Sequence, residues 1–389
     1  MIFATAAEYN PFHNGHAYHV SQMRKLGADG IIAVMSGSFV QRGEPAIMNK
    51  FDRAECAVSG GVDLVLELPV SYAVGSAERF AAGCVRTAEA TGIADAFCFG
   101  SESADISEFE NTVLTIESPD FSKFLQDELA TGKTFAAARS EALKKCGAFV
   151  PEKPNDILAV EYIKEMKRLK SRMKTVTVKR VGDYHGGSEG FASASEIRRK
   201  IMSGTLPRED LPDTTSKAFE RLEKQGAAPA AIERLERMIL GFFRTAKAED
   251  LKKFYAMTEG SENRIIAAAR TATSIEDLYG KIKTKRYTMA TVRRMVIAPF
   301  LQIGKEDPKI PFLRVLAFNR RGAELMKNIK KNSDIPLVTV FTPELASRTE
   351  FAEQIELERR ATDIFQLSTP TVGASFSDFT RKITLSGEE

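Results

Sequence analysis

The segment EYNPFHNGH, at residues 8–16, joins a short apolar stretch at residues 3–6 to a helix-forming stretch at residues 16–26. The apolar stretch predicts a buried β-strand, and Pro11 breaks the chain before the predicted helix begins near Gly15. In a parallel α/β sheet such a segment lies at the carboxyl end of its strand, where ligands bind. The sequence therefore predicts an α/β fold with a ligand site at residues 8–16.

Strand and helix signals continue to alternate through the first half of the chain. Strands separated by helices indicate a parallel sheet with right-handed crossovers. A helical segment at residues 103–150 interrupts the alternation, and we interpret it as an insertion. The further predicted strands are 30–35, 63–68, 94–99 and 176–181, and the further predicted helices are 50–59, 76–91, 155–169 and 195–203.

Strand signals fade after residue 205, where Pro207 and Pro212 mark a boundary. A chain of 389 residues is too long for one ordinary core, so two units are expected. We predict an α/β unit at residues 1–205, including the insertion, and a mainly α-helical unit at residues 206–389. Helical periodicity occurs at residues 214–225, 229–247, 261–271, 289–302, 321–331 and 342–362.

The composition indicates a globular protein of the cytoplasm. Hydrophobic residues make up 43% and charged residues 28%, and the net charge is only +3. No apolar run approaches the roughly 20 residues that cross a bilayer, and the first residues lack the basic start of a signal peptide. The cysteines form no CxxC pair, so we expect reduced thiols and no metal site; they are Cys56, Cys84, Cys98 and Cys146.

The histidines of the first segment suit phosphate chemistry. The start of a helix offers free backbone N–H groups and a positive dipole end, and both favour phosphate. His13 and His16 can point the same way from this turn and donate hydrogen bonds to phosphate oxygens. Gly15 lets a nucleotide approach the backbone closely. On spacing alone, a surface pair or a metal-binding pair fits the two histidines equally well.

These residues also carry a family resemblance. The segment His13-Asn14-Gly15-His16 is similar to the HxGH signature of the nucleotidyltransferase superfamily, and the longer string EYNPFHNGHAYH resembles the bacterial tRNA(Met) cytidine acetate ligases. This resemblance implies a Rossmann-like parallel-sheet nucleotidyltransferase domain followed by a helical region. It continues through SGSFVQRGEPAIMNKFDRAECAV (36–58), LELPVSYAVGSAERFAAG (66–83), FGSE (99–102), KPNDILAVEYIKE (153–165), KTKRYTMATVRR (283–294) and LRVLAFNRRG (313–322).

The resemblance implies an activity as well as a fold. Members of that family use ATP to activate acetate as acetyl-adenylate, with release of pyrophosphate. They then pass the acetyl group to the wobble cytidine of elongator tRNA(Met), which becomes N4-acetylcytidine. Acetyl-CoA is not needed, and Mg²⁺ accompanies the triphosphate. The resemblance thus implies an ATP-dependent ligase, with ATP, acetate and a tRNA as its substrates.

Carried onto this chain, the resemblance implies a set of site residues. His13 and His16 would be catalytic. Gly100 follows the fourth predicted strand, and Arg180 ends the fifth, where a guanidinium can grip phosphate. Asn155 starts a helix, and on local evidence alone an N-cap is the better interpretation of it. The implied ATP-binding residues are Ala6, Ala7, Glu8, Tyr9, Asn10, Pro11, Phe12, His13, Asn14, Gly15, His16, Ala17, Tyr18, His19, Gly100, Asn155 and Arg180.

A second motif, SASEIR at residues 193–198, is similar to the other superfamily signature. Ser193, Ser195 and Arg198 are candidate phosphate contacts, although Ala194 stands where the superfamily commonly has a hydroxyl. Ser193 and Glu196 also fit a capping box, and both interpretations can hold together.

Further basic residues follow the second predicted strand. Lys50 is another candidate phosphate contact. Arg42 and Arg53 lie nearby and could also meet phosphate, acetate or RNA. The alternative for all three is a solvated surface.

Three locally basic stretches, at residues 164–180, 281–294 and 319–331, favour an RNA-binding face over three unrelated solvated helices. Tyr287 follows two basic residues and could stack an unpaired base of a single-stranded loop. The candidate tRNA contacts are Lys285, Arg286, Tyr287, Arg293 and Arg294.

Two other functions remain open at this point. One is a small-molecule adenylyl- or cytidylyltransferase of the same superfamily, which would leave the basic helical half without a purpose. The other is a non-catalytic RNA-binding protein, against which the intact His13, Gly15 and His16 argue. The sequence does not identify the wall of an acetate pocket.

Overall fold

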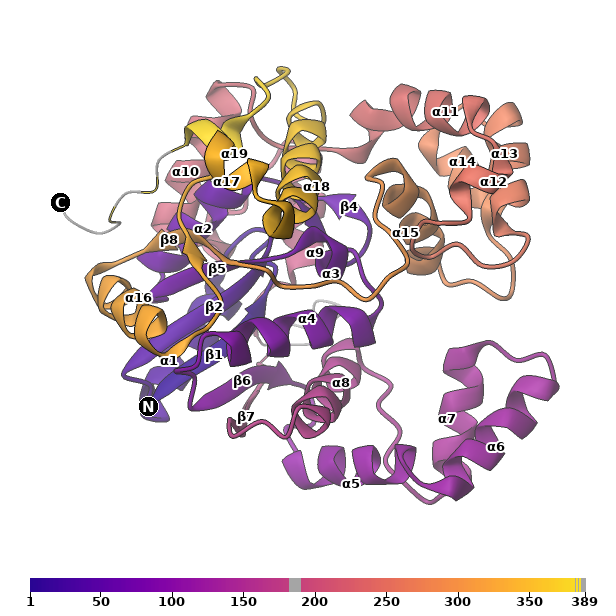
Figure 1. The fold of residues 1–389 in the computed structure, drawn as a ribbon, viewed down its shortest axis with the longest axis horizontal. Helices are drawn as coiled ribbons and strands as arrows, with labels where there is room; N and C mark the ends of the chain where they lie inside the picture. The colour runs from indigo at the N-terminus through magenta and orange to yellow at the C-terminus, as the bar shows by residue number, and fades with distance from the viewer. Residues whose placement is uncertain (182–189, 382, 384, 386–389) are drawn as a thin grey trace.

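A computed structural model describes residues 1–181, 190–381, 383 and 385, and its centre is a seven-stranded sheet (Figure 1). The strand order is β7-β6-β1-β2-β5-β8-β9. Five strands are those that the sequence predicts, and they pair in parallel throughout. They are β1 (Ile2–Ala7), β2 (Gly30–Ser36), β5 (Leu64–Leu68), β6 (Ala96–Ser101) and β7 (Lys174–Lys179).

The sheet contains two strands that the sequence analysis missed. β8 (Leu313–Phe318) pairs antiparallel with β5, and the short β9 (Leu337–Val338) pairs in parallel with β8. The view that strand signals end at residue 205 is therefore wrong. A charged residue interrupts the apolar pattern of β8, but Arg314 is only 2% exposed because Asp378 lies against it. The division of the chain into two units near residue 205 stays a prediction.

Helices cover both faces of the sheet, because successive strand residues point to opposite sides. Phe3 and Ile31 belong to the core on one face, and Ala4 and Val34 to the core on the other. The first face is covered by α1 (Asn14–Lys25), α2 (Lys50–Ser59), α9 (Ala194–Met202) and α10 (Asp213–Lys224). The second is covered by α3 (Val70–Ala73), α4 (Ala77–Ala90), α8 (Pro154–Arg168) and, beside β8, α16 (Arg320–Asn332).

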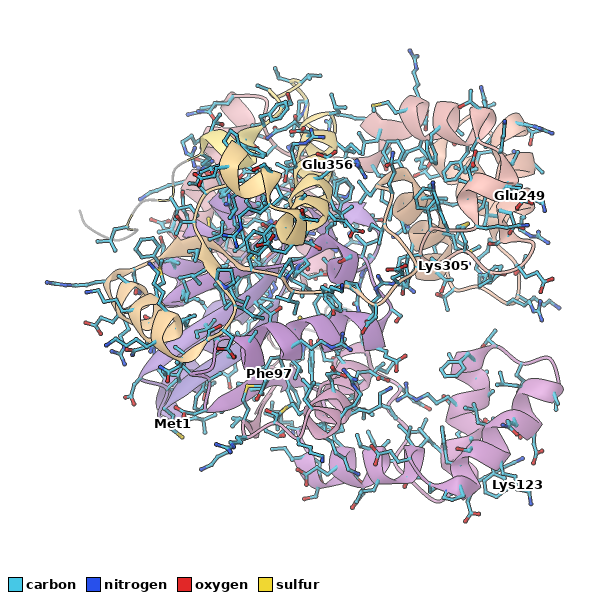
Figure 2. All side chains as sticks on the ribbon, viewed as in Figure 1. Met1, Phe97, Lys123, Glu249, Lys305 and Glu356 are labelled. Carbon is cyan, nitrogen blue, oxygen red and sulfur yellow. The ribbon has the colours of Figure 1, made fainter. Side chains whose placement is uncertain are left out.

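The predicted insertion is helical and projects from the sheet, as the place of Lys123 shows (Figure 2). A small core of its own, which includes Phe121 and Leu143, holds its last two helices together. The helices are α5 (Ile106–Ile116), α6 (Pro119–Ala130) and α7 (Phe135–Lys145).

A second helical cluster, which carries Glu249 in Figure 2, packs around a core that includes Ile265, Leu278 and Val296. Ala361 and Phe365 of α18 (Thr349–Gln366), which comes later in the chain, also belong to this core. The cluster consists of η2 (Ile232–Leu235), α11 (Glu236–Thr245), α12 (Ala248–Leu251), α13 (Ser261–Thr271), α14 (Ile275–Ile282) and α15 (Met289–Phe300). The remaining elements are β3 (Phe39–Val40), β4 (Glu44–Pro45), η1 (Arg208–Asp210), α17 (Pro343–Ser347) and α19 (Ser377–Thr380).

Lys50 lies in a buried ion cluster that joins the two ends of the chain. Its Nζ atom lies 2.8 Å from Glu67 and 2.7 Å from Asp378, and all three side chains are almost fully buried. Burial alone would lower the pKa of Lys50, but the carboxylates of Asp378 and Glu67 raise it overall. The expectation that Lys50 contacts phosphate or lies on a solvated face is therefore wrong, because buried carboxylates of its own chain neutralise it.

In the part of the chain that the structure describes, no helix has both the length and the apolar character to cross a membrane.

Candidate active site

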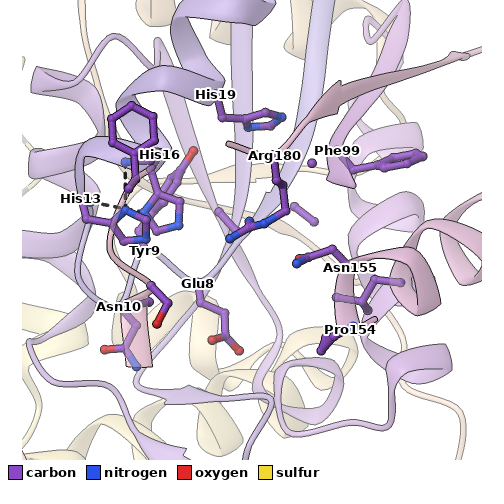
Figure 3. A pocket seen from close by; sticks show the side chains of 18 of the residues that line it. Glu8, Tyr9, Asn10, His13, His16, His19, Phe99, Pro154, Asn155 and Arg180 are labelled. Carbon is purple, nitrogen blue, oxygen red and sulfur yellow. Dashed lines mark hydrogen bonds between the residues drawn. The ribbon is translucent and has the colours of Figure 1, made fainter. Parts of the chain in front are cut away.

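The first motif forms the start of α1. His13 is its N-cap, and its Nδ1 accepts a hydrogen bond from the backbone N–H of Gly15 at 3.0 Å. The backbone N–H of His13 in turn donates to Nδ1 of His16 at 3.3 Å (Figure 3). Since both Nδ1 atoms accept, the hydrogen of each neutral ring lies on Nε2.

The imidazoles of this motif are neutral near pH 7. Burial and, to a lesser degree, the charges of Arg180 and Arg198 together lower the pKa of His13 to about 3. Burial and Arg180 lower the pKa of His19 to about 4, and burial followed by His13 takes the pKa of His16 well below its usual value. A neutral imidazole remains a hydrogen-bond donor through one nitrogen, so the motif offers dipoles rather than charges to an anion.

A cavity of about 270 Å³ opens beside these histidines at the carboxyl ends of β1 and β6. Most of the residues expected to bind ATP line it, namely Ala6, Ala7, Glu8, Tyr9, Asn10, His13, Gly15, His16, Tyr18, His19, Gly100, Asn155 and Arg180. Pro11, Phe12, Asn14 and Ala17 do not. Phe12 is fully buried behind the motif, and the amide of Asn14 donates to the carbonyl of Glu209 instead.

Glu102 does not line the cavity itself but holds two residues of the wall opposite the histidines. Its Oε1 accepts a hydrogen bond of 2.6 Å from the amide of Asn155 and lies 3.8 Å from Nε of Arg180. Asn155 is not the N-cap of α8, which is Lys153, so the capping alternative is wrong. Gly100 lies beside Arg180, and a Cβ atom at Gly100 would lie 3.4 Å from Cγ of that side chain. Glu102 thus orients the amide of Asn155 and the guanidinium of Arg180 toward the cavity.

The second motif docks against the first. Arg198 donates from Nη1 to the carbonyl of Asn10 at 2.8 Å and lies 3.4 Å from the hydroxyl of Ser195. Ser193 caps α9 by accepting from the backbone N–H of Glu196 at 3.2 Å, as the capping pattern predicts. Ser193, Ser195 and Arg198 all line the cavity, so the second motif adds one guanidinium and two hydroxyls to the neutral imidazoles of the first.

Arg53 lies under the cavity rather than in it. Its side chain is fully buried and donates to the carbonyls of Met48, Ser36, Gly37 and Glu8. It thereby fastens the carboxyl ends of β1 and β2 to the start of α2. Neither the ligand contact nor the solvated surface expected for Arg53 is correct, because backbone carbonyls take up its donors.

Other lining residues were missed from the sequence. Gln41, Phe80, Phe99, Leu158, Tyr162 and Phe191 also line the cavity, and most of them are apolar. Their pattern in the sequence is that of ordinary core residues, so periodicity offers no signal that separates them from the core. Arg42, which the sequence suggested as a ligand contact, lines the cavity as well.

Comparison with known proteins places this site in a family. The HIGH Nucleotidyl Transferase family model matches residues 1–378. The tRNA(Met) cytidine acetate ligase of Acetivibrio thermocellus is 36% identical over 410 residues, which cover 98% of this chain and 99% of that protein. The ligase of Thermotoga maritima is 37% identical and covers 94% of this chain and 95% of its own length. This chain belongs to the tRNA(Met) cytidine acetate ligase family.

Solved structures of the Thermotoga maritima family member agree closely with this fold. The complex with alpha-thio ATP has a TM-score of 0.91 and 34% identity, covering 98% of this chain and all of the other. The apo form has a TM-score of 0.92 at the same identity, covering 99% of each chain. The mainly parallel sheet and the helical C-terminal region that the sequence predicted are thus confirmed.

The five residues of this chain that were expected to contact tRNA fall into two groups. Lys285 and Arg286 are exposed in the loop between α14 and α15, and Tyr287 is half-buried with its hydroxyl 3.0 Å from that of Thr258. Arg293 lies 2.5 Å from Glu44, and Arg294 donates to the carbonyl of Gln41 at 3.4 Å. Arg293 and Arg294 therefore hold the loop at residues 41–44, beside the cavity. The RNA contacts of all five residues stay a prediction.

Proposed function

We propose that this protein is an ATP-dependent tRNA(Met) cytidine acetate ligase. The observation that carries the proposal is the cavity at the carboxyl ends of β1 and β6, where His13, His16, Arg180 and Arg198 meet. Neutral imidazoles and guanidinium groups around one hollow are suited to a triphosphate. The relative from Thermotoga maritima, solved with alpha-thio ATP, has the same fold over its full length.

In the first step an acetate oxygen attacks the α-phosphate of ATP, and pyrophosphate leaves in line with the attack. His13 and His16 donate hydrogen bonds from Nε2 to phosphate oxygens as negative charge shifts onto the leaving group. Arg180 and Arg198 add fixed positive charge on two sides of the cavity. Because phosphoryl-type displacement depends on positioning and charge stabilisation, no nucleophilic side chain is required.

Mg²⁺ accompanies ATP in this proposal as part of the substrate. Of the residues that the structure describes, no three His, Cys, Asp or Glu side chains form a metal cluster. Glu8 is the one carboxylate among the described residues that line the cavity. This composition fits a hydrated Mg²⁺ held mainly by phosphate oxygens, which is the usual mode for this ion.

In the second step the exocyclic amine of the wobble cytidine attacks the acetyl carbonyl, and AMP leaves. We assign the recognition of elongator tRNA(Met) to the helical region after residue 205, with Lys285 and Arg286 at its exposed loop. A tRNA substrate places the protein in the cytoplasm.

Incubation of the protein with ATP, labelled acetate and tRNA tests the proposal. Label in the tRNA, recovered as N4-acetylcytidine after digestion, is the expected result. A stable dinucleotide without labelled tRNA would instead indicate a small-molecule adenylyl- or cytidylyltransferase. Absence of turnover would indicate a non-catalytic RNA-binding protein. Labelled formate and propionate in the same assay define which carboxylates the enzyme accepts.

A further inference from the structure

Glu8 is an acidic residue in a cavity that is otherwise suited to binding an anion. The lining of the cavity includes Arg42, Lys179, Arg180 and Arg198, and Glu8 is the one acidic side chain among its described residues. A carboxylate weakens the binding of a triphosphate by like-charge repulsion. The binding of ATP therefore gives no reason for an acid at this position.

The backbone of Glu8 is fixed at the end of β1. Its carbonyl accepts a hydrogen bond from Nη1 of Arg53, whose other donors hold the end of β2. The side chain is only partly exposed, and its Oε1 accepts from the backbone N–H of Gln41 at 2.9 Å. The carboxylate is thus oriented by a single bond to one of its two oxygens.

The second oxygen faces no partner within the described part of the chain. No hydrogen bond or ion pair from those residues reaches Oε2 of Glu8. A purely structural role at Gln41 would be met by Oε1 alone. Figure 3 shows the Glu8 side chain between His13 and Tyr9 on one side and Asn155 and Pro154 on the other. Its position is therefore central to the cavity, between the two walls.

The proposed acetyl transfer needs a proton acceptor, and no residue has yet been assigned to that role. When the amine of cytidine attacks the acetyl group, its nitrogen must lose a proton for a neutral amide to form. The imidazoles of His13 and His16 have no lone pair free to take this proton, because each Nδ1 already accepts a backbone hydrogen bond and each Nε2 carries the ring hydrogen. Among the charged side chains of the described lining, Glu8 is the one that can accept a proton.

We propose that Glu8 is the general base of the acetyl-transfer step, an assignment that rests on the proposed ligase function. The N4 nitrogen forms a bond to the acetyl carbon, and the bond between that carbon and the phosphate oxygen breaks. AMP leaves with the electron pair of the broken bond. The proton of the amine passes to Oε2 of Glu8, so atoms and charge balance without another reactant.

The test separates the two steps with the variant Glu8→Gln, which keeps the size of the side chain and its acceptor oxygen for Gln41. Hydroxylamine traps acetyl-adenylate as the hydroxamate without tRNA, and labelled acetate reports transfer to tRNA. We expect acetyl transfer to tRNA to be slowed by about 10²- to 10⁴-fold, the usual contribution of general-base catalysis, and hydroxamate formation to be slowed far less. Glu8→Asp should recover part of the transfer rate because it restores a carboxylate.

Glu353→Gln is the matched control, since Glu353 is exposed on α18 and does not line the cavity, and it should change neither rate. Equal losses of hydroxamate and of acetyl-tRNA in Glu8→Gln would overturn the assignment, because Glu8 would then serve adenylate formation. Unchanged transfer would overturn it too. Failure of the wild type to form hydroxamate from ATP and acetate would instead overturn the ligase function itself.

Discussion

The imidazole rings of His13 and His16 stack with their centroids 3.8 Å apart and their planes tilted by 32°. Two charged rings could not be held so close in a buried site, and burial accordingly lowers the pKa of both. Tyr9 packs edge-on against His16 from the other side, with ring centroids 4.9 Å apart. The pair is therefore held as two neutral donors in fixed positions.

Removal of one of these donors should slow the first step. We expect His16→Ala to slow acetate-dependent release of pyrophosphate by about 10²-fold or more, as for the loss of other preorganised donors. Its thermal midpoint should fall without loss of the fold, because the ring contacts with His13 and Tyr9 are lost together with a hydrogen bond worth about 1 kcal/mol. An unchanged rate of pyrophosphate release would contradict the role assigned to His16.

Acid should destabilise the fold through the same histidines. An unfolded imidazole binds a proton near pH 6.5, whereas folded His13 does so only at about 3. Between these values the unfolded state holds the extra proton, so the free energy of unfolding falls as pH falls, by about 1.4 kcal/mol per pH unit for each such imidazole. Urea titrations of the wild type and His13→Gln across this range measure the difference. Parallel pH slopes in the two proteins would contradict the prediction.

Gly43 joins the loop beside the cavity to the helical cluster. Its φ is +77°, and a Cβ atom there would lie 3.0 Å from the backbone carbon of Arg293. Gly204 has a similar φ of +88° but nothing within 4 Å, so Gly204→Ala is the matched control. We expect Gly204→Ala to cost about 1–2 kcal/mol from the backbone conformation alone. Gly43→Ala should cost roughly 1–3 kcal/mol more because of crowding. Equal unfolding midpoints for the two variants would show that the loop accommodates the added methyl group without loss of stability.

The exposed loop between α14 and α15 should act on tRNA and not on ATP. The double variant Lys285→Ala/Arg286→Ala should bind tRNA more weakly and show a salt dependence with a slope smaller by about 2, one for each lost phosphate contact. Hydroxamate formation from acetate should stay at the wild-type rate. Lys123→Ala, at an exposed position of the insertion, serves as the control. Unaltered tRNA binding by the double variant would remove this loop from the RNA surface.

The buried ion cluster should contribute strongly to stability. Asp378→Asn leaves Lys50 and Arg314 without one of their carboxylates, and breaking a buried pair costs about 3–5 kcal/mol. Asp213→Asn breaks an ion pair to Lys217 whose side chains are 86% and 74% exposed. This control should cost at most about 1 kcal/mol. Denaturant titrations of both variants give the comparison, and a small loss in Asp378→Asn would mean that the remaining carboxylates suffice.

The local part of the site was accessible from the sequence. The strand, the turn and the helix around His13 are set by neighbours along the chain, and so is the cap formed by Ser193. Gly100 and Arg180 were expected at the ends of two predicted strands, and the parallel pairing of β6 with β7 brings them together. In each case a short motif at the end of an element carries the information.

The long-range part was not accessible in the same way. Lys50 and Arg53 occur at the start of an amphipathic helix, where a basic residue usually lies in solvent, yet both are buried. Their partners are backbone carbonyls and carboxylates that only the tertiary fold brings near, such as Asp378. β8 escaped notice for a related reason, since Arg314 breaks its apolar pattern and is neutralised by the same distant residue.

The dependence of Lys50 on Asp378 also bears on the order of events during protein synthesis. A ribosome that has released the β-strands near the start of the chain must still add several hundred residues, up to position 378, before this lysine receives its second carboxylate. Until residue 318 has been added, the nascent sheet also lacks β8 along the edge formed by β5. The emerging polypeptide thus carries an unpaired strand edge and an incompletely neutralised cation through most of its synthesis.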